Sequence, residues 1–376
     1  MTLAVSGGDL QRLRRLNALA VVSALRGAGP LPLTRLAEHT ELARATIKEV
    51  VRDLISMGWV AEMDPSTGGG KGRPARRYRF RAENGRVLGL DIGAHKVLAA
   101  ISDLDGEVRH VSREPITPGH TRRERLAAVD RAVDACLAAT GTSPADVWIT
   151  TAGSTGYVDN EGNVVISRAI HDWSGVPLAD HLSGRLAGEV LVDNDSRLAA
   201  LAECRRGSAR DARNIVYLHI GRRAGAAIIL DGVPLRGSTG AAGEIGLHPL
   251  FHLADSSDVL TAGNSGQAVF DAARRGEADA LNAVLRYVKV LALATAAMAL
   301  TVDPQVIVIG GGFSRSADVL MPPLRAELET MCLRTPELRA STLGDECVAI
   351  GAVCLGVEHL NQRFFNPEDG PVAPLR

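Results

Sequence analysis

The residues best suited to chemistry lie in two short segments of the second half of the chain. Asp195 follows Asn194, and Glu244 follows a run of small residues. A carboxylate such as Asp195 can take a proton from a hydroxyl group as a general base. It can also bind a sugar hydroxyl in a protein that does no chemistry, a role that Asn194 would share. Because a helix is predicted over 196–206, capping of that helix is a third role for Asp195.

Two glycine-containing turns have small residues that let backbone N–H groups approach a phosphate. They are Asp91-Ile92-Gly93-Ala94-His95-Lys96 and the turn that begins at Gly221. In the first turn His95 is bulky, so a plain hairpin turn is the alternative. In the second, Arg222 and Arg223 crowd a site that needs bare backbone, and they could hold an anionic ligand or form a solvated turn. We therefore expect the second turn to be a damaged phosphate site. A third run, Gly310-Gly311-Gly312, is also explained by a strand-to-helix turn, which is common in α/β proteins.

Basic residues gather at the N-terminal end of the chain. Residues 1–81 carry 14 Lys and Arg against 7 Asp and Glu, whereas the whole chain carries 42 against 43. A basic head on an acidic body favours nucleic-acid binding by the head. The residues expected to contact DNA are Arg44, Thr46, Lys48 and Arg52 on a helix and Lys71, Arg73, Arg76 and Arg77 in a hairpin.

The hydrophobic spacing in residues 1–81 predicts a winged helix-turn-helix. Leucines and valines from Leu10 to Leu25 recur at helical spacing. The pattern continues with a short helix over Thr34 to His39, with Thr34 as its cap, and a third helix over Arg44 to Met57 that buries Ile47, Val50, Val51, Leu54 and Ile55. Strands at 59–63 and 75–81 form the wing, which would reach phosphates or the minor groove. A helical protein-interaction domain with a solvated basic face is the alternative.

The rest of the chain alternates strands and helices in two similar halves. Strands are predicted at 87–92, 97–102, 107–115, 147–152, 215–220, 226–230 and 306–309, with helices at 121–141 and 278–301. Each half opens with a strand, a glycine turn and a second strand. This pattern predicts a duplicated α/β fold with a cleft between two lobes.

The cysteines and the most apolar segment indicate a cytoplasmic protein. Cys136, Cys204, Cys332, Cys347 and Cys354 are odd in number and scattered, which argues against a disulfide framework. No signal peptide is evident at the N-terminus. The apolar run at 290–302 is shorter than the about 20 residues of a membrane span, so we expect a buried helix there.

The ordered motifs resemble the ROK family, which contains repressors and sugar kinases. They are Asp91 to Lys96, Asp193-Asn194-Asp195 and Gly240-Ala241-Ala242-Gly243-Glu244-Ile245-Gly246. The resemblance implies a two-lobed body of the actin-like ATPase fold behind the head. It divides the chain into a head at 1–81, a first lobe at 85–192 completed by a C-terminal helix at about 346–362, and a second lobe at 193–345.

The same resemblance assigns roles to individual residues. Asp195 matches the family's catalytic aspartate, and Glu244 matches its sugar-contacting glutamate. The ligand-binding candidates are Asn194, Asp195, Glu244, His248 and His171, and the ATP-binding candidates are Asp91, Gly93, Lys96, Gly221 and Gly311. Trp173, in the loop that resembles the sugar side of the family's site, either stacks on a sugar or packs against the helix over 177–186. We favour packing.

The chain departs from the family at its zinc site. The family usually has a histidine and three cysteines there, whereas the segment from Pro249 to Ser256 has no cysteine. Zinc with thiolate ligands is therefore not expected. His248 and His252 alone make a weak case for a metal. We expect no cofactor, and Mg–ATP only if the protein is a kinase.

These observations lead to one expected function and two alternatives. We expect a DNA-binding transcriptional regulator, a repressor of carbohydrate-related genes, that senses a sugar or sugar derivative through a degenerate kinase-like body. Its expected partners are a double-stranded DNA operator, a small-molecule effector and further copies of itself in a homodimer or homotetramer, with no membrane. The alternatives are an ATP-dependent sugar kinase with Asp195 as general base, and a DNA-binding protein whose body only dimerises.

Overall fold

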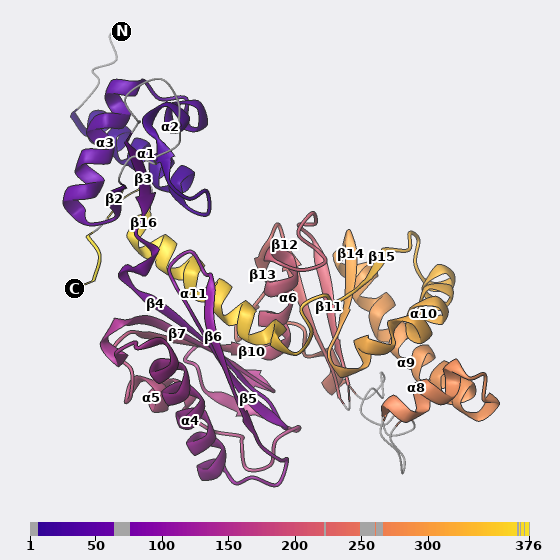
Figure 1. The fold of residues 1–376 in the computed structure, drawn as a ribbon. Coiled ribbons are helices and arrows are strands. Elements are labelled where there is room, and N and C mark those ends of the chain that lie inside the picture. The colour runs from indigo at the N-terminus through magenta and orange to yellow at the C-terminus, as the bar shows by residue number, and fades with distance from the viewer. Residues whose placement is uncertain are drawn as a thin grey trace.

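The computed structural model describes residues 7–63, 76–221, 223–248, 260, 266–366, 368, 370–371 and 373–375. These residues form a head and two lobes, with a C-terminal helix that runs from between the lobes to the head (Figure 1). The predicted fold class, a winged helix-turn-helix followed by a two-lobed α/β body, is confirmed.

The head contains three helices and a small antiparallel sheet of order β1-β3-β2. Its elements are α1 (Gly7–Leu25), β1 (Leu31–Pro32), α2 (Leu33–Thr40), α3 (Arg44–Met57), β2 (Val60–Met63) and β3 (Arg77–Phe80). Gly58 ends α3 in the left-handed conformation, with φ of 93°, and its N–H bonds to the carbonyls of the last turn. This tight exit turns the chain from α3 directly into the wing strand β2.

The packing of the head corrects two details of the prediction. Ile47, Val50, Val51 and Leu54 are buried as expected, but Ile55 is exposed because it lies beyond the edge of the stripe that α3 presents to the core. The cap assigned to Thr34 is also wrong. Helix α2 begins one residue earlier, at Leu33, and no side chain caps it because its N-cap position is occupied by Pro32.

The first lobe is built on a five-stranded sheet of order β10-β7-β4-β5-β6. Its elements are β4 (Arg86–Ile92), β5 (Lys96–Ser102), β6 (Val108–Pro115), α4 (Arg122–Thr140), β7 (Val147–Ser154), α5 (Leu178–Ser183) and β10 (Glu189–Asn194). The first three strands are antiparallel neighbours, and β7 and β10 then add in parallel. Thr121 and Glu124 form a capping box that starts α4, and Gly141 ends it.

The second lobe repeats this plan. Its sheet has the order β15-β14-β11-β12-β13, which matches the order of the first sheet strand for strand. Its elements are β11 (Ile215–Ile220), β12 (Ala224–Leu230), β13 (Val233–Pro234), α8 (Gly266–Arg274), α9 (Ala278–Val302), β14 (Val306–Gly310), α10 (Ala317–Met331) and β15 (Glu337–Ala340). The predicted duplication is therefore real, and α6 (Asp195–Arg205) leads from the first sheet into the second.

Helix α11 (Cys347–Phe364) returns the chain to the first lobe. It packs along α6 and against β4, β7 and β5. Gly351 allows the close approach to α6, because a Cβ there would lie 1.9 Å from the carbonyl oxygen of Leu198. The predicted boundary between residues 192 and 193 falls inside β10, whose last residue is Asn194.

The remaining elements are short. They are β8 (Tyr157–Val158), β9 (Val164–Ile166), β16 (Phe365–Asn366), β17 (Gly370–Pro371), and 3-10 turns at Ala82–Asn84, Pro144–Asp146, Glu244–Leu247, Gly312–Ser316 and Gly344–Glu346. Strand β17 lies against α1, so the end of the chain reaches back to the head (Figure 1).

Helix α9 is buried on one face only. By length and composition it is, within the described residues, the one helix that could cross a membrane, yet 61% of its most apolar stretch lies inside the protein. Tyr287 and Leu291 are almost completely buried in the second lobe, as in the core helix of a globular domain. The opposite face is exposed and mixed: Leu293 and Leu300 are about half exposed, and Arg286 and Lys289 are exposed as well. The predicted buried helix at 290–302 is thus only partly buried.

Candidate DNA-binding and ligand-binding sites

Helix α3 presents a basic face to solvent. Arg44, Lys48 and Arg52 are exposed, and Thr46 is half-buried beside them. Arg52 lies 3.6 Å from Asp53 in an exposed ion pair, which leaves the arginine free to exchange partners. No side chain caps the N-terminus of α3, where Ala43 is the N-cap. Its first N–H groups are therefore available to a phosphate oxygen.

The wing contributes a second basic element. Arg76 forms an ion pair of 2.9 Å with Glu62 at the base of the hairpin, with both side chains largely exposed. Lys71 and Arg73, predicted at the tip, lie outside the described residues. The described part of the wing therefore places two of the four predicted wing residues: Arg76 in this salt bridge, and Arg77 exposed at the start of β3.

Asp195 is held at the junction of β10 and α6. The hydroxyl of Thr155 donates to Asp195 Oδ2 over 2.7 Å, and the N–H of Ser196 donates to Oδ1 over 2.7 Å. The capping role considered for Asp195 belongs instead to Asn194, whose side chain accepts from the N–H of Arg197. The Oδ2 atom of Asp195 therefore faces Thr155 of the first lobe.

Glu244 and Asn194 meet next to Asp195. Asn194 Nδ2 donates to Glu244 Oε1 over 3.3 Å and to the carbonyl of Gly156 over 3.0 Å. Burial raises the pKa of Glu244, and the negative charge of Asp195 raises it further. Three of the five predicted ligand-binding residues therefore form one polar cluster. His248, by contrast, lies exposed at the end of the turn that carries Glu244.

An ion cluster behind these residues was not predicted from the sequence. Asp193 is buried and accepts from Arg197 through one oxygen and from Arg236 through the other, the latter over 2.6 Å. Arg197 also donates to the carbonyl of Gly240 over 2.8 Å. The cluster ties the end of β10 to the loop that leads to Glu244. The only signal in the sequence was the position of Asp193 in the conspicuous triplet.

Lys96 and Asp91, both from the first glycine turn, form an ion pair with each other. Lys96 lies 3.4 Å from the buried Asp91 and also donates to the carbonyl of Asp345. Burial raises the pKa of Asp91 to about 6, against the effect of Lys96, and the charge of Asp195 adds to the rise. Asp91 and Asp195 therefore share one electrostatic environment, although they come from different elements.

Arg125 fixes the shape of the same turn. Its buried guanidinium donates to the carbonyl of Gly93 over 2.6 Å and to that of Thr117 over 3.1 Å. Burial lowers the pKa of this arginine. Sequence reasoning missed Arg125 because an arginine in the first turn of a helix gives no sign that it will be buried.

The second and third glycine turns lie together at the ends of two parallel strands. A Cβ on Gly311, which has φ of 81°, would lie 2.4 Å from the carbonyl oxygen of Ile220. A Cβ on Gly221 would lie 4.0 Å from the backbone nitrogen of Gly312. Arg223 is exposed beside them, and Arg222 lies outside the described residues. Of the three predicted ATP-binding turns, the first thus belongs to the first lobe and the other two to the second.

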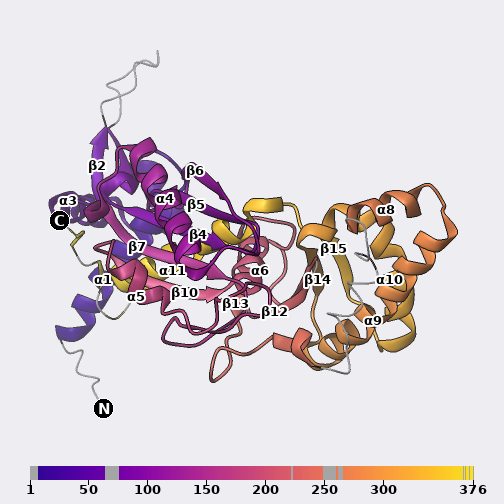
Figure 2. The same ribbon diagram turned by 90° about the horizontal axis from the view of Figure 1, so that it is seen from below.

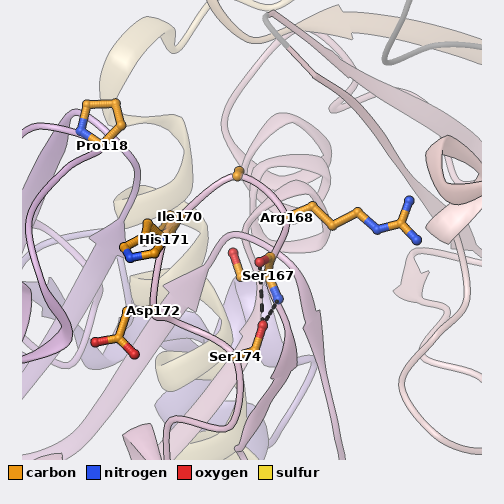
Figure 3. A pocket seen from close by; sticks show the side chains of 8 residues that line it. Pro118, Ser167, Arg168, Ile170, His171, Asp172 and Ser174 are labelled. Atoms are coloured by element: carbon orange, nitrogen blue, oxygen red, sulfur yellow. Dashed lines mark hydrogen bonds between the residues drawn. The ribbon is translucent and has the colours of Figure 1, made fainter.

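A loop of the first lobe lines a pocket of about 550 Å³ (Figure 3). Its lining residues are Pro118, Ser167, Arg168, Ala169, Ile170, His171, Asp172 and Ser174. His171 therefore belongs to the pocket rather than to the cluster around Asp195. Trp173 is completely buried, donates to Ser154 over 2.9 Å, and packs in one core with Leu178 of α5. The packing role favoured for Trp173 is confirmed.

The described residues hold no group of three or more His, Cys, Asp or Glu side chains suited to a metal. His248 is described, but His252 and the rest of the segment at 249–256 are not. The family's zinc site would need thiolate ligands in that segment, and its sequence has no cysteine. The residues present therefore do not fit that zinc site.

An aromatic cluster joins the head to the body. Trp59 stacks on Phe80 of the head at 5.8 Å and contacts Trp148, Phe364 and Phe365 of the body at 4.7 to 6.0 Å between ring centres. Phe364 is the last residue of α11. The same helix therefore packs on α6, which carries Asp195, and ends in the core of the head.

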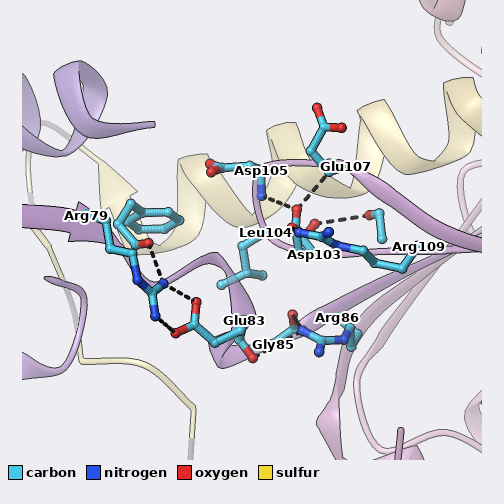
Figure 4. A network of polar contacts seen from close by, with 12 residues as sticks. Arg79, Glu83, Gly85, Arg86, Asp103, Leu104, Asp105, Glu107 and Arg109 are labelled. Atoms are coloured by element: carbon cyan, nitrogen blue, oxygen red, sulfur yellow. Dashed lines mark hydrogen bonds and ion pairs between the residues drawn. The ribbon is translucent and has the colours of Figure 1, made fainter. Parts of the chain in front are cut away.

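Polar contacts surround this aromatic cluster. Arg26 of the head forms an ion pair of 2.9 Å with Asp105 and donates to the carbonyl of Leu104 in the first lobe. Arg79 and Glu83 form a two-pronged ion pair where the head meets β4 (Figure 4). This bond lowers the pKa of Glu83. These contacts hold the head against the first lobe, and the two lie side by side in the view from below (Figure 2).

The winged helix-turn-helix gives the head the fold of a DNA-binding domain. The two lobes, whose sheets have the same strand order, give the body a sugar-kinase-like fold. The chain belongs to the ROK family, whose family model matches residues 87–259 and 252–358. An IclR helix-turn-helix domain matches residues 16–63.

Individual relatives include both regulators and enzymes. The chain is 21% identical to a xylose repressor of Caldicellulosiruptor bescii, over 94% of this chain and 98% of that protein. It is 27% identical to a glucokinase of Halalkalibacterium halodurans, over 70% of this chain and 92% of the enzyme. A solved ROK family transcriptional regulator, a homologue of the E. coli MLC protein, has the same fold with a TM-score of 0.73. It is 22% identical to this chain and covers 95% of it and 99% of its own length.

Proposed function

We propose that this protein is a transcriptional repressor of carbohydrate-related genes that binds double-stranded DNA through α3 and the wing and responds to a sugar or sugar derivative. The observation that carries the proposal is the connection between sites: α11 packs on the helix of Asp195 at one end and on Trp59 of the head at the other. The similarity to a xylose repressor along almost the whole chain supports it.

The ligand would act by changing how the lobes sit on α11. A sugar held by Asn194 and Asp195 at the end of the first sheet would also contact Glu244, which belongs to the second lobe. Binding would favour one arrangement of the lobes only to the extent that the ligand binds that arrangement more tightly. Because α11 ends in the aromatic cluster at Trp59, such a change would move the head relative to a second head on DNA.

The protein would work without zinc and without ATP as resident cofactors. Lys96 is engaged by Asp91 and by Asp345, so the first turn does not offer a free lysine to a phosphate. Because the proposed protein acts on chromosomal DNA, we propose that it is cytoplasmic.

A second copy of the chain would complete the DNA-binding unit. Winged helix-turn-helix proteins commonly bind two half-sites as dimers. We place the contact between the two copies on the exposed face of α9. Four leucines on this face, Leu281, Leu285, Leu293 and Leu300, are 40% to 56% exposed. A group of exposed leucines of this kind is typical of a protein interface.

Recovery of genomic DNA tests the proposed function. The full chain would be mixed with fragments of the source genome at physiological salt, because a basic head binds any DNA at low salt. We expect a few enriched fragments that share two half-sites next to genes of carbohydrate metabolism. Arg44→Ala would lose the enrichment, whereas Arg325→Ala, on the exposed side of α10, would keep it. Wild-type protein that enriches no fragment over bulk DNA would overturn the proposal.

A sugar kinase is the second candidate function, favoured by the geometry at Asp195. The 2.7 Å bond from Thr155 orients the carboxylate as a general base would require, and the glucokinase relative shares the body. This function predicts ADP formation from Mg–ATP with a hexose, abolished by Asp195→Asn. Absence of ADP formation across a panel of hexoses would eliminate it.

A further inference from the structure

A loop of the second lobe is held by side chains of the first lobe and of α6. This loop, residues 236–240, follows β13 and precedes the turn that carries Glu244. We call it the strap. Each of its last three carbonyls accepts a hydrogen bond from a different side chain. These bonds run from Asn160 to Ser238 over 3.0 Å, from Tyr157 to Thr239 over 3.0 Å, and from Arg197 to Gly240 over 2.8 Å.

Arg236 begins the strap and binds the end of the first sheet. Its guanidinium donates to the buried Asp193 over 2.6 Å and to the carbonyl of Asp159 over 3.4 Å. Asp193 belongs to β10 and directly precedes Asn194. Because Asp193 is buried, solvent and salt screen this ion pair less than a pair on the surface. The start of the strap is therefore fixed beside Asn194.

The end of the strap lies in close contact with the first lobe. Gly240 is buried and has φ of 94°, and a Cβ there would lie 2.4 Å from the carbonyl oxygen of Val158. A residue with a side chain would therefore push the strap away. The N–H of Ala242 donates to the carbonyl of Arg236 over 3.2 Å, which closes the strap into a turn. The backbone that leads to Glu244 is thus held at both ends of the strap.

Glu244 needs such support, because its own contacts hold it weakly. Among the described residues, the one hydrogen bond to its carboxylate comes from Asn194 and is 3.3 Å long. Burial and the negative charge of Asp195 both raise the pKa of Glu244, which means that both oppose the ionised carboxylate in this position. An ionised Glu244 would therefore move towards solvent unless the backbone that carries it is held.

We infer that the strap, through the ion pair between Arg236 and Asp193, positions Glu244 of the second lobe against Asn194 of the first, so that the two lobes present one binding surface. Arg236 and Asp193 are thus positioning residues, which act on a ligand through Glu244. This inference rests on the proposed function, in which Glu244 contacts the sugar but nothing is said of what keeps it in place.

Hydrogen exchange of the full chain, followed by mass spectrometry, tests the positioning without a ligand. Arg236→Gln leaves Asp193 paired with Arg197, so the variant should still fold. We expect the amides of 236–247 to exchange severalfold faster in this variant, while those of α4 exchange at the wild-type rate. Arg236→Lys keeps a positive charge for Asp193 and should restore part of the protection.

Two further variants show whether the effect belongs to the strap. Tyr157→Phe removes only the hydroxyl that donates to Thr239, so it should speed exchange in the strap by a smaller factor. Arg213→Gln is the matched control, because Arg213 bonds to Asp231 in the turn between β12 and β13, within the second lobe. It should leave the exchange of 236–247 unchanged.

Sugar affinity separates positioning from a merely structural role. Binding of xylose, glucose and N-acetylglucosamine would be measured by calorimetry for wild type, Arg236→Gln, Glu244→Gln and the double variant. For a sugar that binds wild type, Arg236→Gln should weaken binding about tenfold, since a hydrogen bond to a charged group contributes about that much. In the Glu244→Gln background the same change should cost less than about twofold, because the carboxylate to be positioned is already gone.

Two results would overturn the inference and leave the proposed function standing. Unchanged exchange of 236–247 in Arg236→Gln would mean that the ion pair does not hold the strap. Equal losses of sugar affinity in the two backgrounds would mean that Arg236 does not act through Glu244. If none of the three sugars binds wild type, the proposed function fails for these ligands, whereas the exchange result still decides the inference.

Discussion

Single residues of the body decide what the candidate site can bind. Asp195 and Glu244 lie beside Asn194, an arrangement that would suit the hydroxyl groups of the proposed ligand. Lys96 pairs with the buried Asp91. In the proposed function the site would therefore keep its sugar-binding residues, while the lysine of its first glycine turn is engaged within the protein.

Asp91 should make stability depend on pH in a defined window. Its pKa is raised from 3.8 to about 6 in the folded protein, so the folded state binds a proton more tightly than the unfolded state. That contribution to stability is fully present below about pH 4 and is lost as the pH rises through 6. Between these values wild type should lose up to about 3 kcal/mol relative to Asp91→Asn.

Denaturant unfolding of both proteins from pH 4 to pH 7 measures this difference. Glu346→Gln, which removes an exposed carboxylate, serves as the control and should follow wild type. Parallel pH profiles for wild type and Asp91→Asn would show that Asp91 titrates normally.

The basic face of α3 should account for much of the DNA affinity. Lys48→Ala should weaken binding to all sequences and reduce the salt dependence by about one counterion, as expected for loss of a phosphate contact. Arg44→Ala should weaken binding to the specific DNA about tenfold and reduce the preference for that sequence if Arg44 contacts a base edge. Fluorescence anisotropy at several salt concentrations separates the two effects. An unchanged Kd for both variants would mean that another surface binds DNA.

The sequence showed which residues form the sugar end of the site but not how they are held. Asp195 and Glu244 stand in recognisable motifs, so their proximity could be predicted. The buried arginines Arg125 and Arg197 could not be, because nothing in a helical pattern distinguishes a buried arginine from a solvated one. One partner of each arginine comes from a segment more than 30 positions away in the chain: Gly93 for Arg125 and Gly240 for Arg197.

At the scale of elements, helices and strands with strong local signals were predicted almost exactly. Helix α3 and strand β11 begin and end at the predicted residues. The strand β10 was missed although Val190, Leu191 and Val192 are typical strand residues, because this apolar run has only three residues between Glu189 and the polar triplet at 193–195. The return of 365–371 to the head could not be predicted either, since only tertiary packing fixes that segment.

Helix α11 and its aromatic end should couple the head to the body. Phe365→Ala removes a half-buried ring that contacts Trp59 and Phe80. We expect a loss of about 2 kcal/mol, below the range for a fully buried Phe, and a weaker effect of ligand on DNA affinity. Calorimetric unfolding and DNA binding measure the two effects, with Val233→Ala at an exposed position as the control. A full ligand effect in Phe365→Ala would place the coupling elsewhere.

The exposed face of α9 should hold two copies together. Leu293→Glu places a charge in the centre of the proposed contact, and we expect it to shift the protein from dimer to monomer in sedimentation equilibrium. Leu333→Glu, at a fully exposed position away from α9, should leave the dimer intact. A dimer that survives Leu293→Glu together with Leu285→Glu would exclude this face.

At the scale of the whole molecule, the fold links two sites through one continuous packing path. The sugar residues lie at the start of α6, α11 packs along α6, and the end of α11 lies in the core of the head. This path needs no mobile linker, because Trp59 and Arg26 fix the head on the first lobe. We therefore expect a change in the position of α11 to be transmitted to α3.

The most direct test of this account is the affinity of the full chain for one of its own enriched DNA fragments, at fixed physiological salt, across a panel of sugars and sugar derivatives. The account predicts that at least one sugar derivative changes the Kd by tenfold or more, and that Asp195→Asn removes this response while basal DNA affinity stays the same. If a sugar binds the body, by calorimetry, and no sugar changes the Kd, the two sites are not coupled and the central claim is contradicted.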